Sequence, residues 1–318
     1  MDDGLAFLKS EDGSTPISIE MLPPNRGIGV NSIHQFIHKL GDWRPAFISV
    51  TYHQAFKIEE GSKSVWNRKK PGTLGVCAIL KFQYGINVIP HVICGGFSRF
   101  ESEDFLVDLD YLGLNTILAL RGDPRKGDEK FRHHPDGHMH ASQLVNQINQ
   151  LNEGNFLENI KESKPTSFTV GVAGYPEGHK ECANLDADIN NLRDKVDQGA
   201  SFIITQMFFD NNLFFQFERK CREAGITVPI IPGIKILSSK RQIELLPEIF
   251  HISIPEELRN SILMCNNDSE ACELGIEWAI KQGRELIEHG VPCLHIFSMS
   301  NASTLVPLLE GIGIHLNT

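Results

Sequence analysis

The chain has 318 residues, of which 41% are hydrophobic and 22% charged, and its formal net charge at pH 7 is −10. This length supports a large buried core, and the composition excludes an intrinsically disordered chain. The acidic balance argues against a nucleic-acid groove or an anionic membrane surface, because both bind proteins through a basic field. A small-molecule partner is therefore expected.

The N-terminus and the cysteines indicate the compartment. The opening stretch, MDDGLAFLKSEDGS, has acidic residues where a signal peptide has basic ones, and its apolar part is too short. No later run is apolar enough for a transmembrane helix. The seven cysteines include no C-x-x-C pair, which fits reduced thiols. We therefore expect a cytoplasmic protein without a membrane partner.

Apolar runs rich in β-branched residues recur along the chain and predict buried strands. Eight runs qualify: 16–22, 47–53, 86–94, 115–122, 167–176, 201–209, 228–234 and 293–299. Helical periodicity predicts helices between them at 31–40, around 66–82, 102–113, 140–152, 183–199, 211–225 and 238–249, and two helices over 255–290. This alternation predicts an α/β fold, a closed (β/α)8 TIM barrel forming one domain over residues 1–318, with residues 1–15 as a flexible N-terminal extension.

An open doubly wound sheet is the alternative architecture. It is disfavoured because no G-x-G-x-x-G loop follows the first predicted strand. No internal repeat or linker divides the chain. The longest predicted loop, 123–138, follows the fourth strand and is expected to lie over the mouth of the barrel, since loops of that length are often functional.

A (β/α)8 barrel carries its chemistry at the carboxyl ends of its strands. Glu20 lies between Ile19 and Met21, and a carboxylate in an apolar strand is costly unless it is paired or functional, so we favour a function. The RGD tripeptide at 121–123 belongs to a ring of such strand-end residues, which makes an adhesion motif the weaker interpretation. The ring comprises Glu20, Thr51, Tyr52, His91, Arg121, Asp123, Tyr175, Glu177 and Gln206.

Histidines gather in the stretch HHPDGHMH at 133–140. Imidazole is a common ligand of zinc and other transition metals, so a metal-dependent barrel hydrolase that uses His91 with this cluster is one alternative. The loose spacing of the histidines favours a solvated loop, and we predict no metal site. Taken alone, His91 is equally compatible with a core histidine.

Several motifs together resemble those of the flavin-dependent methylenetetrahydrofolate reductases. They are, in order, ISIEMLPP, FISVTYH, IPHVICGG, LALRGD, AGYPEGH, DADINNLRDKVDQGA and IITQMFFD, and the matches extend over about 17–300. The resemblance implies a barrel of the bacterial type, comprising the catalytic domain only. It also implies that the protein uses FAD to pass a hydride from NADH or NADPH to 5,10-methylenetetrahydrofolate. The product would be 5-methyltetrahydrofolate, in one-carbon metabolism and methionine supply.

The resemblance assigns chemical roles to two carboxylates. Glu20 matches the general acid that assists protonation at folate N10, and Asp123 matches the carboxylate that tunes the flavin and stabilises the substrate cation. The apolar neighbours of Glu20 would raise its pKa, and Arg121 would help to keep Asp123 ionised, so the two groups need opposite environments. The substrate-binding positions of the family fall on Gln206, Gln242 and Tyr175.

The resemblance also places the FAD contacts. Asp188, Asn191 and Lys195 have the spacing of one helix face. The chain departs from the family pattern at His140, where many relatives have tyrosine, and at Asn301, where many have a basic residue. A homo-oligomer is expected. The FAD positions are Thr51, His91, Leu120, Arg121, Gly122, Asp123, His140, Ala141, Tyr175, His179, Asp188, Asn191 and Lys195.

Two further alternatives are a barrel that keeps the folate pocket as a non-catalytic partner subunit and a flavin-linked proline dehydrogenase on a related barrel. The presence of both Glu20 and Asp123 favours the reductase over the partner subunit. The sequence leaves open whether NADH or NADPH is the donor.

Overall fold

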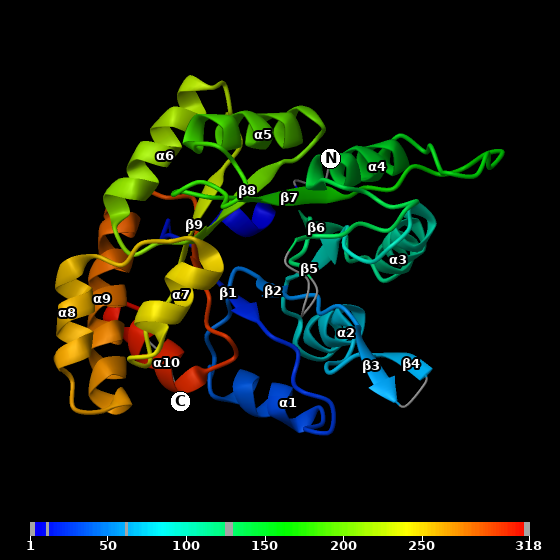
Figure 1. The fold of residues 1–318 in the computed structure, drawn as a ribbon. Coiled ribbons are helices and arrows are strands. Elements are labelled where there is room, and N and C mark those ends of the chain that lie inside the picture. The colour runs from blue at the N-terminus through cyan, green and yellow to red at the C-terminus, as the bar shows by residue number, and fades with distance from the viewer. Residues whose placement is uncertain (1–3, 11–12, 61–62, 125–129, 315–318) are drawn as a thin grey trace.

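A closed barrel of eight parallel strands forms the centre of the molecule (Figure 1). The structure is a computed structural model that describes residues 4–10, 13–60, 63–124 and 130–314. Every barrel strand overlaps one of the eight predicted apolar runs, so the predicted (β/α)8 fold is confirmed. In barrel order the strands are β1 (Ile17–Met21), β10 (Leu294–Ile296), β9 (Ile230–Ile234), β8 (Phe202–Met207), β7 (Thr169–Gly174), β6 (Thr116–Leu120), β5 (Val88–Ile93) and β2 (Ile48–Val50).

The helices lie around the outside of this barrel (Figure 1). No helix in the described ranges is long and apolar enough to cross a membrane. The helices are α1 (Asn31–His38), α2 (Thr73–Tyr84), α3 (Arg99–Tyr111), α4 (Ala141–Asn152), α5 (Leu185–Asp197), α6 (Asn211–Glu223), α7 (Gln242–Phe250), α8 (Glu256–Met264), α9 (Asp268–His289) and α10 (Ala302–Gly311).

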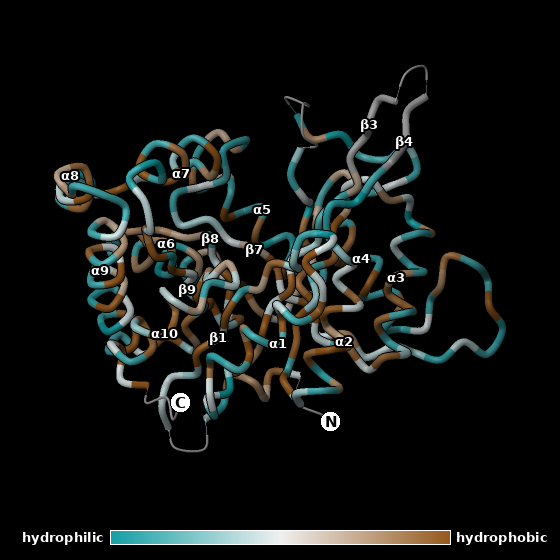
Figure 2. Tube along the Cα trace, turned by 90° about the horizontal axis from the view of Figure 1, so that it is seen from below, coloured by the Kyte–Doolittle hydropathy of each residue, from teal (hydrophilic) through white to brown (hydrophobic). Residues whose placement is uncertain are grey.

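One predicted helix was wrong at its start. The segment expected to be helical over 66–82 begins with strand β4 (Lys63–Asn67), which pairs antiparallel with β3 (Phe56–Glu60). Helix α2 starts only at Thr73, after Pro71 and Gly72. The hairpin projects from the barrel in both views (Figure 1, Figure 2).

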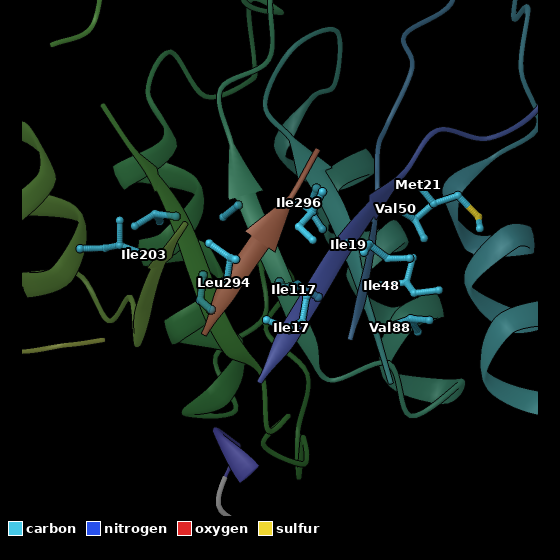
Figure 3. Close-up of a cluster of buried hydrophobic side chains, with 14 of the residues drawn as sticks. Ile17, Ile19, Met21, Ile48, Val50, Val88, Ile117, Ile203, Leu294 and Ile296 are labelled. Atoms are coloured by element: carbon cyan, nitrogen blue, oxygen red, sulfur yellow. The ribbon is translucent and has the colours of Figure 1, made fainter. Parts of the chain in front are cut away.

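Each barrel strand has two buried faces, because successive side chains point to opposite sides. The outer face packs against the helices, and Figure 3 shows part of this layer, where Ile17 and Ile19 of β1 lie beside Leu294 and Ile296 of β10. The other face lines the lumen. Its apolar cluster comprises Phe47, Ile89, Leu118, Phe202, Ile204, Ile231 and Cys293.

The N-terminal segment closes the lumen at the amino ends of the strands. The ring of Phe7 packs edge-on against Phe47 and Phe202, with centroid distances of 5.0 and 5.5 Å. Leu5 and Leu8 join the same apolar cluster. This part of the segment expected as a flexible extension is therefore packed on the barrel and closes the lumen at this end.

Helix α9 lies unusually close to the chain that follows β9. A Cβ atom added at Gly275 of α9 would overlap the backbone carbonyl of Leu237. Only glycine fits this contact without displacing the helix or the segment. Leu237 lies two residues after Lys235, so α9 supports the part of the chain that enters the barrel mouth.

Candidate active site

The lumen changes from apolar to polar toward the carboxyl ends of the strands. In β9, Ile231 belongs to the lumen cluster, so Gly233 and Lys235 continue the same face. The strand register pairs Ile19 with Ile296, and Ile296 with Ile234. Glu20 directly follows Ile19, and Lys235 directly follows Ile234. The two side chains therefore lie at the same level of the barrel.

Glu20 is a largely, but not fully, buried carboxyl group at this polar end. Its side chain is 13% exposed, and its Oε2 atom lies 3.9 Å from Nε2 of His91. Burial raises the pKa of Glu20 to about 7, although the positive charge of Lys235 acts to lower it. A carboxyl group with this pKa holds its proton near neutral pH and can still release it, which is the requirement for a general acid.

His91, on β5, is buried and uncharged. Burial, together with the nearby His53, lowers its pKa to about 3. The contact with Glu20 is therefore not an ion pair at neutral pH. Within the described part of the chain, the Nε2 atom of His91 is a buried polar atom without a hydrogen-bond partner. A buried polar atom without a hydrogen bond lowers the stability of the fold, unless a bound group supplies the missing partner.

His295 of β10 forms a second buried histidine site that the sequence analysis missed. Its Nδ1 atom lies 2.9 Å from the Ser18 hydroxyl, and its Nε2 atom lies 3.4 Å from the Ser49 hydroxyl. Burial and the neighbouring His91 lower its pKa to about 3. The alternation of residues 293–299 could have revealed it, because His295 shares the lumen face with Cys293 and Phe297.

The RGD segment follows β6 and is held by a side-chain pair. Arg121 donates two hydrogen bonds to the Glu181 carboxylate, at 2.6 and 2.9 Å, and its guanidinium lies 4.7 Å from the centre of the Phe131 ring. The direct partner of the Arg121 guanidinium is therefore Glu181, and the charge of Asp123 also acts on Arg121. Asp123 is exposed, and Gly122 has a φ of +88°, which favours glycine.

A second group of predicted residues meets beside the end of β7. The rings of Tyr175 and His179 lie edge to face, 4.8 Å apart, and the backbone N–H of His179 donates to the Asp188 carboxylate at 3.2 Å. The Lys195 ammonium lies 6.0 Å from the centre of the Tyr175 ring and donates to the carbonyl of Ala173. This cluster joins the end of β7 to helix α5.

The predicted face of α5 is present in the structure. The Cys182 thiol donates to Asp188 at 3.4 Å, and the Asn191 amide donates to the Cys182 sulfur at 3.3 Å. Burial lowers the pKa of Lys195, and the Asp188 charge opposes that change. Asp188, Asn191 and Lys195 therefore lie on one side of the helix, next to the end of β7.

The remaining predicted residues are more widely placed. The Gln206 side-chain oxygen accepts the N–H of Met207, and the Gln242 oxygen accepts the N–H of Ser238 at 2.7 Å. Thr51, just after β2, has its hydroxyl 3.0 Å from Nε2 of His53. His140 is exposed before α4, where Ala141 is the first helical residue, and Asn301 caps the N-terminus of α10.

The histidine-rich stretch does not form a metal centre in the described ranges. The Nε2 atom of buried His138 lies 2.6 Å from the Gln147 side-chain oxygen, which fixes the loop to α4. The Nδ1 atom of His133 contacts the carbonyl of His134. No group of three or more histidine, cysteine, aspartate or glutamate residues within the described ranges could hold a metal ion.

Comparison with known families decides the family. The model of the family described as "Methylenetetrahydrofolate reductase" matches residues 7–313. The chain belongs to this family.

Named relatives match nearly the whole of this chain. The 5,10-methylenetetrahydrofolate reductase of Escherichia coli is 29% identical over 96% of this chain and 94% of its own length. Methylenetetrahydrofolate reductase 1 of Schizosaccharomyces pombe is 30% identical, over 93% of this chain and 46% of its own. The probable methylenetetrahydrofolate reductase (NADPH) of Caenorhabditis elegans is 28% identical over 93% and 42%. The chain therefore spans less than half of these two eukaryotic relatives.

A solved structure shares the fold. It is an uncharacterized protein from Clostridium thermocellum that binds two copies of 5-methyl-5,6,7,8-tetrahydrofolic acid. The TM-score is 0.57 at 14% identity, and the match covers 97% of this chain and 98% of that one. At this identity the similarity establishes the architecture alone.

Proposed function

We propose that this protein is an FAD-dependent reductase that passes a hydride from NADH or NADPH to 5,10-methylenetetrahydrofolate, giving 5-methyltetrahydrofolate. The observation that carries the proposal is Glu20. It is a largely buried carboxyl group with a pKa of about 7 in the polar mouth of a barrel that belongs to this family. Its environment gives it the acidity that the reaction needs near neutral pH.

The residues around the mouth fit a flavin nucleotide. His91 offers a buried nitrogen without a partner in the described chain, Lys195 offers a cation for phosphate, and the turn at Gly122 gives close backbone approach. When bound, the flavin would accept the hydride from the nicotinamide and deliver it to the folate. The proposed FAD contacts are Thr51, His91, Leu120, Arg121, Gly122, Asp123, His140, Ala141, Tyr175, His179, Asp188, Asn191 and Lys195.

Glu20 supplies a proton in this proposal. Its carboxyl group gives the proton to N10 of the folate as the bond from N10 to the bridging carbon breaks, which leaves a cation at N5. Glu20 is protonated in about half of the molecules at pH 7, so the acid form is available. His91 is neutral beside it and adds no positive charge that would oppose the developing cation.

Asp123 supplies the fixed negative charge for that cation. Because the Arg121 guanidinium is bound by Glu181, it makes no direct pair with Asp123 that would neutralise the carboxylate. A preorganised charge stabilises a cation without reorganising during the reaction. Gln206, Gln242 and Tyr175 are proposed to hold the pterin by hydrogen bonding and ring contact.

We also propose that the protein acts in the cytoplasm, because all seven cysteines are free thiols. One-carbon metabolism, with supply of the methyl group for methionine, follows from the proposed product. Assembly into a homo-oligomer stays a prediction.

The visible absorption spectrum tests the proposal. Purified protein, loaded with FAD if necessary, is recorded anaerobically before and after NADH or NADPH, and again after 5,10-methylenetetrahydrofolate. We expect the flavin band to bleach with one nucleotide and to return with the folate. A protein that cannot be loaded with FAD would refute the proposal. A flavin whose absorbance responds to proline, but not to the nicotinamide nucleotides and the folate, would also refute it. Dialysis against a chelator before the assay distinguishes this reductase from a metal-dependent hydrolase, because only the hydrolase would lose its activity.

A further inference from the structure

Lys235 is a buried cation that the proposed mechanism has not yet used. It follows the last residue of β9 and is 8% exposed. Within the described ranges, its ammonium has neither a hydrogen bond nor an ion pair at contact distance. A buried ammonium without a contacting partner is costly, so a nearby negative charge in the working protein would compensate for it.

The barrel register places Lys235 opposite one acidic group. Lys235 and Glu20 lie at the same level, on β9 and β1, with β10 between them. The other titratable groups around Glu20 are His91 on β5, His295 on β10 and His53 after β2. Burial lowers the pKa of each of these histidines to about 4 or below, so they are neutral at pH 7.

The charge effect between the two residues is mutual. The Lys235 charge acts to lower the pKa of Glu20. Burial lowers the pKa of Lys235, and the Glu20 charge opposes that change. Among the described residues, Lys235 is the cation that acts on Glu20. Burial of Glu20 acts in the opposite direction, and burial is the larger effect.

We propose that Lys235 is the counter-charge of Glu20: its ammonium stabilises the carboxylate that remains once Glu20 has given its proton to the folate. This inference rests on the proposed function. The proton passes from the Glu20 oxygen to N10, and no bond to Lys235 forms or breaks. Lys235 is therefore a positioning residue that acts through Glu20.

This role has a specific kinetic signature. Without the cation, the buried carboxylate would be less stable, so Glu20 would become a weaker acid. A weaker acid stays protonated to higher pH but transfers its proton more slowly. Loss of Lys235 should therefore lower the maximal rate of flavin reoxidation. It should also shift the pH at which this rate falls to half of its maximum to a higher value. A purely structural defect would lower the rate without shifting this pH.

The test compares Lys235→Met and Lys235→Arg with wild type in the FAD-loaded protein. Reoxidation of the reduced flavin by 5,10-methylenetetrahydrofolate is followed by stopped-flow absorbance across a pH series. We expect Lys235→Met to move the midpoint upward by about one pH unit and to lower the plateau at low pH. Lys235→Arg should keep the midpoint near that of wild type, because the charge is retained.

Lys240→Met is the matched control, because it removes the same charge five positions further along the chain. The Lys240 ammonium donates to the carbonyl of Cys265, away from Glu20. The pH midpoint of flavin reoxidation in Lys240→Met should equal that of wild type. An unmoved midpoint in Lys235→Met, or an equal movement in Lys240→Met, would overturn the proposal. If Lys235→Met does not fold, Lys235→Gln removes the same charge with a side chain that can hydrogen-bond.

A second measurement separates this inference from the proposed function. Carbon-13 NMR of protein with labelled glutamate carboxyl groups titrates Glu20 directly, with Glu20→Gln identifying its signal. Should the wild-type flavin be reduced but never reoxidised by the folate, the proposed function fails. The NMR midpoint then still shows whether Lys235 sets the acidity of Glu20, and an unchanged midpoint in Lys235→Met refutes the coupling itself.

Discussion

The Nε2 atom of His91 lies 3.9 Å from the Oε2 atom of Glu20, and burial displaces the pKa values of the two groups in opposite directions, to about 3 and about 7. At pH 6 both side chains are therefore mainly uncharged. A neutral pair can stay buried without the desolvation penalty of two ions. The barrel therefore keeps Glu20 mainly protonated at this pH.

Replacement of Glu20 by glutamine should separate the two half-reactions. The amide keeps the size of the side chain but has no acidic proton. We expect reduction of the flavin by the nicotinamide nucleotide to persist, and reoxidation by 5,10-methylenetetrahydrofolate to fall by roughly 10²-fold or more. Stopped-flow measurement of each half-reaction checks this. Equal losses in both would remove Glu20 from the role of general acid.

The same substitution should change how stability depends on pH. The pKa of Glu20 is raised from 4.5 to about 7 in the folded protein, so its contribution is complete below pH 4.5 and is lost as the pH rises through 7. Glu20→Gln should therefore gain stability relative to wild type over this interval, by on the order of 3 kcal/mol. Urea unfolding of both proteins at pH 5, 6, 7 and 8 measures the difference. A constant difference would show that Glu20 is not perturbed.

Lys195 should matter for flavin retention. Lys195→Met removes the cation beside Tyr175 and Asp188 without shortening the side chain greatly. We expect the dissociation constant for FAD to rise by roughly tenfold or more, as for loss of one charge-assisted contact. Arg193→Met is the control, since Arg193 is an exposed cation of the same helix. Fluorescence titration of apoprotein with FAD should separate the two variants, and matching affinities would argue against a phosphate contact for Lys195.

Gly122→Ala should also impair flavin binding. Its φ of +88° is strained for alanine, and the new Cβ would lie 3.2 Å from the Gln54 amide nitrogen. Gly225→Ala carries a comparable strain, with a φ of +86° and open space around the added Cβ. Both variants should lose about 1 kcal/mol of stability, measured by urea unfolding. Only Gly122→Ala should lose FAD, and an equal effect on FAD in both would indicate general destabilisation.

The sequence predicted the barrel well because its signal is strong. The eight strands are buried on both faces and appear as continuous apolar runs. The hairpin of β3 and β4 was missed because its sequence, FKIEE and KSVWN, is rich in lysine and glutamate, which are depleted in strands. Helix α10 likewise lay in a stretch for which no prediction had been made.

The site was less predictable, because sequence gives strand ends but not contacts across the barrel. Glu20 stood out as a carboxylate among apolar neighbours. Lys235 did not, since a lysine after a strand is usually solvated, and its burial depends on the register of β9 with β10 and β1. The sequence places Arg121 near Asp123, but nothing in it indicates that the fold brings Glu181, sixty residues away, into contact with Arg121.

The contact between Gly275 and Leu237 links the exterior of the protein to its reaction chamber. Because a Cβ atom at 275 would overlap the Leu237 carbonyl, glycine at this position allows α9 to pack directly against the segment that follows Lys235. The packing at residue 275 thus affects a segment of the barrel mouth from outside the barrel. A substitution at 275 would therefore displace α9 or the segment that follows Lys235 without changing any residue of the proposed site.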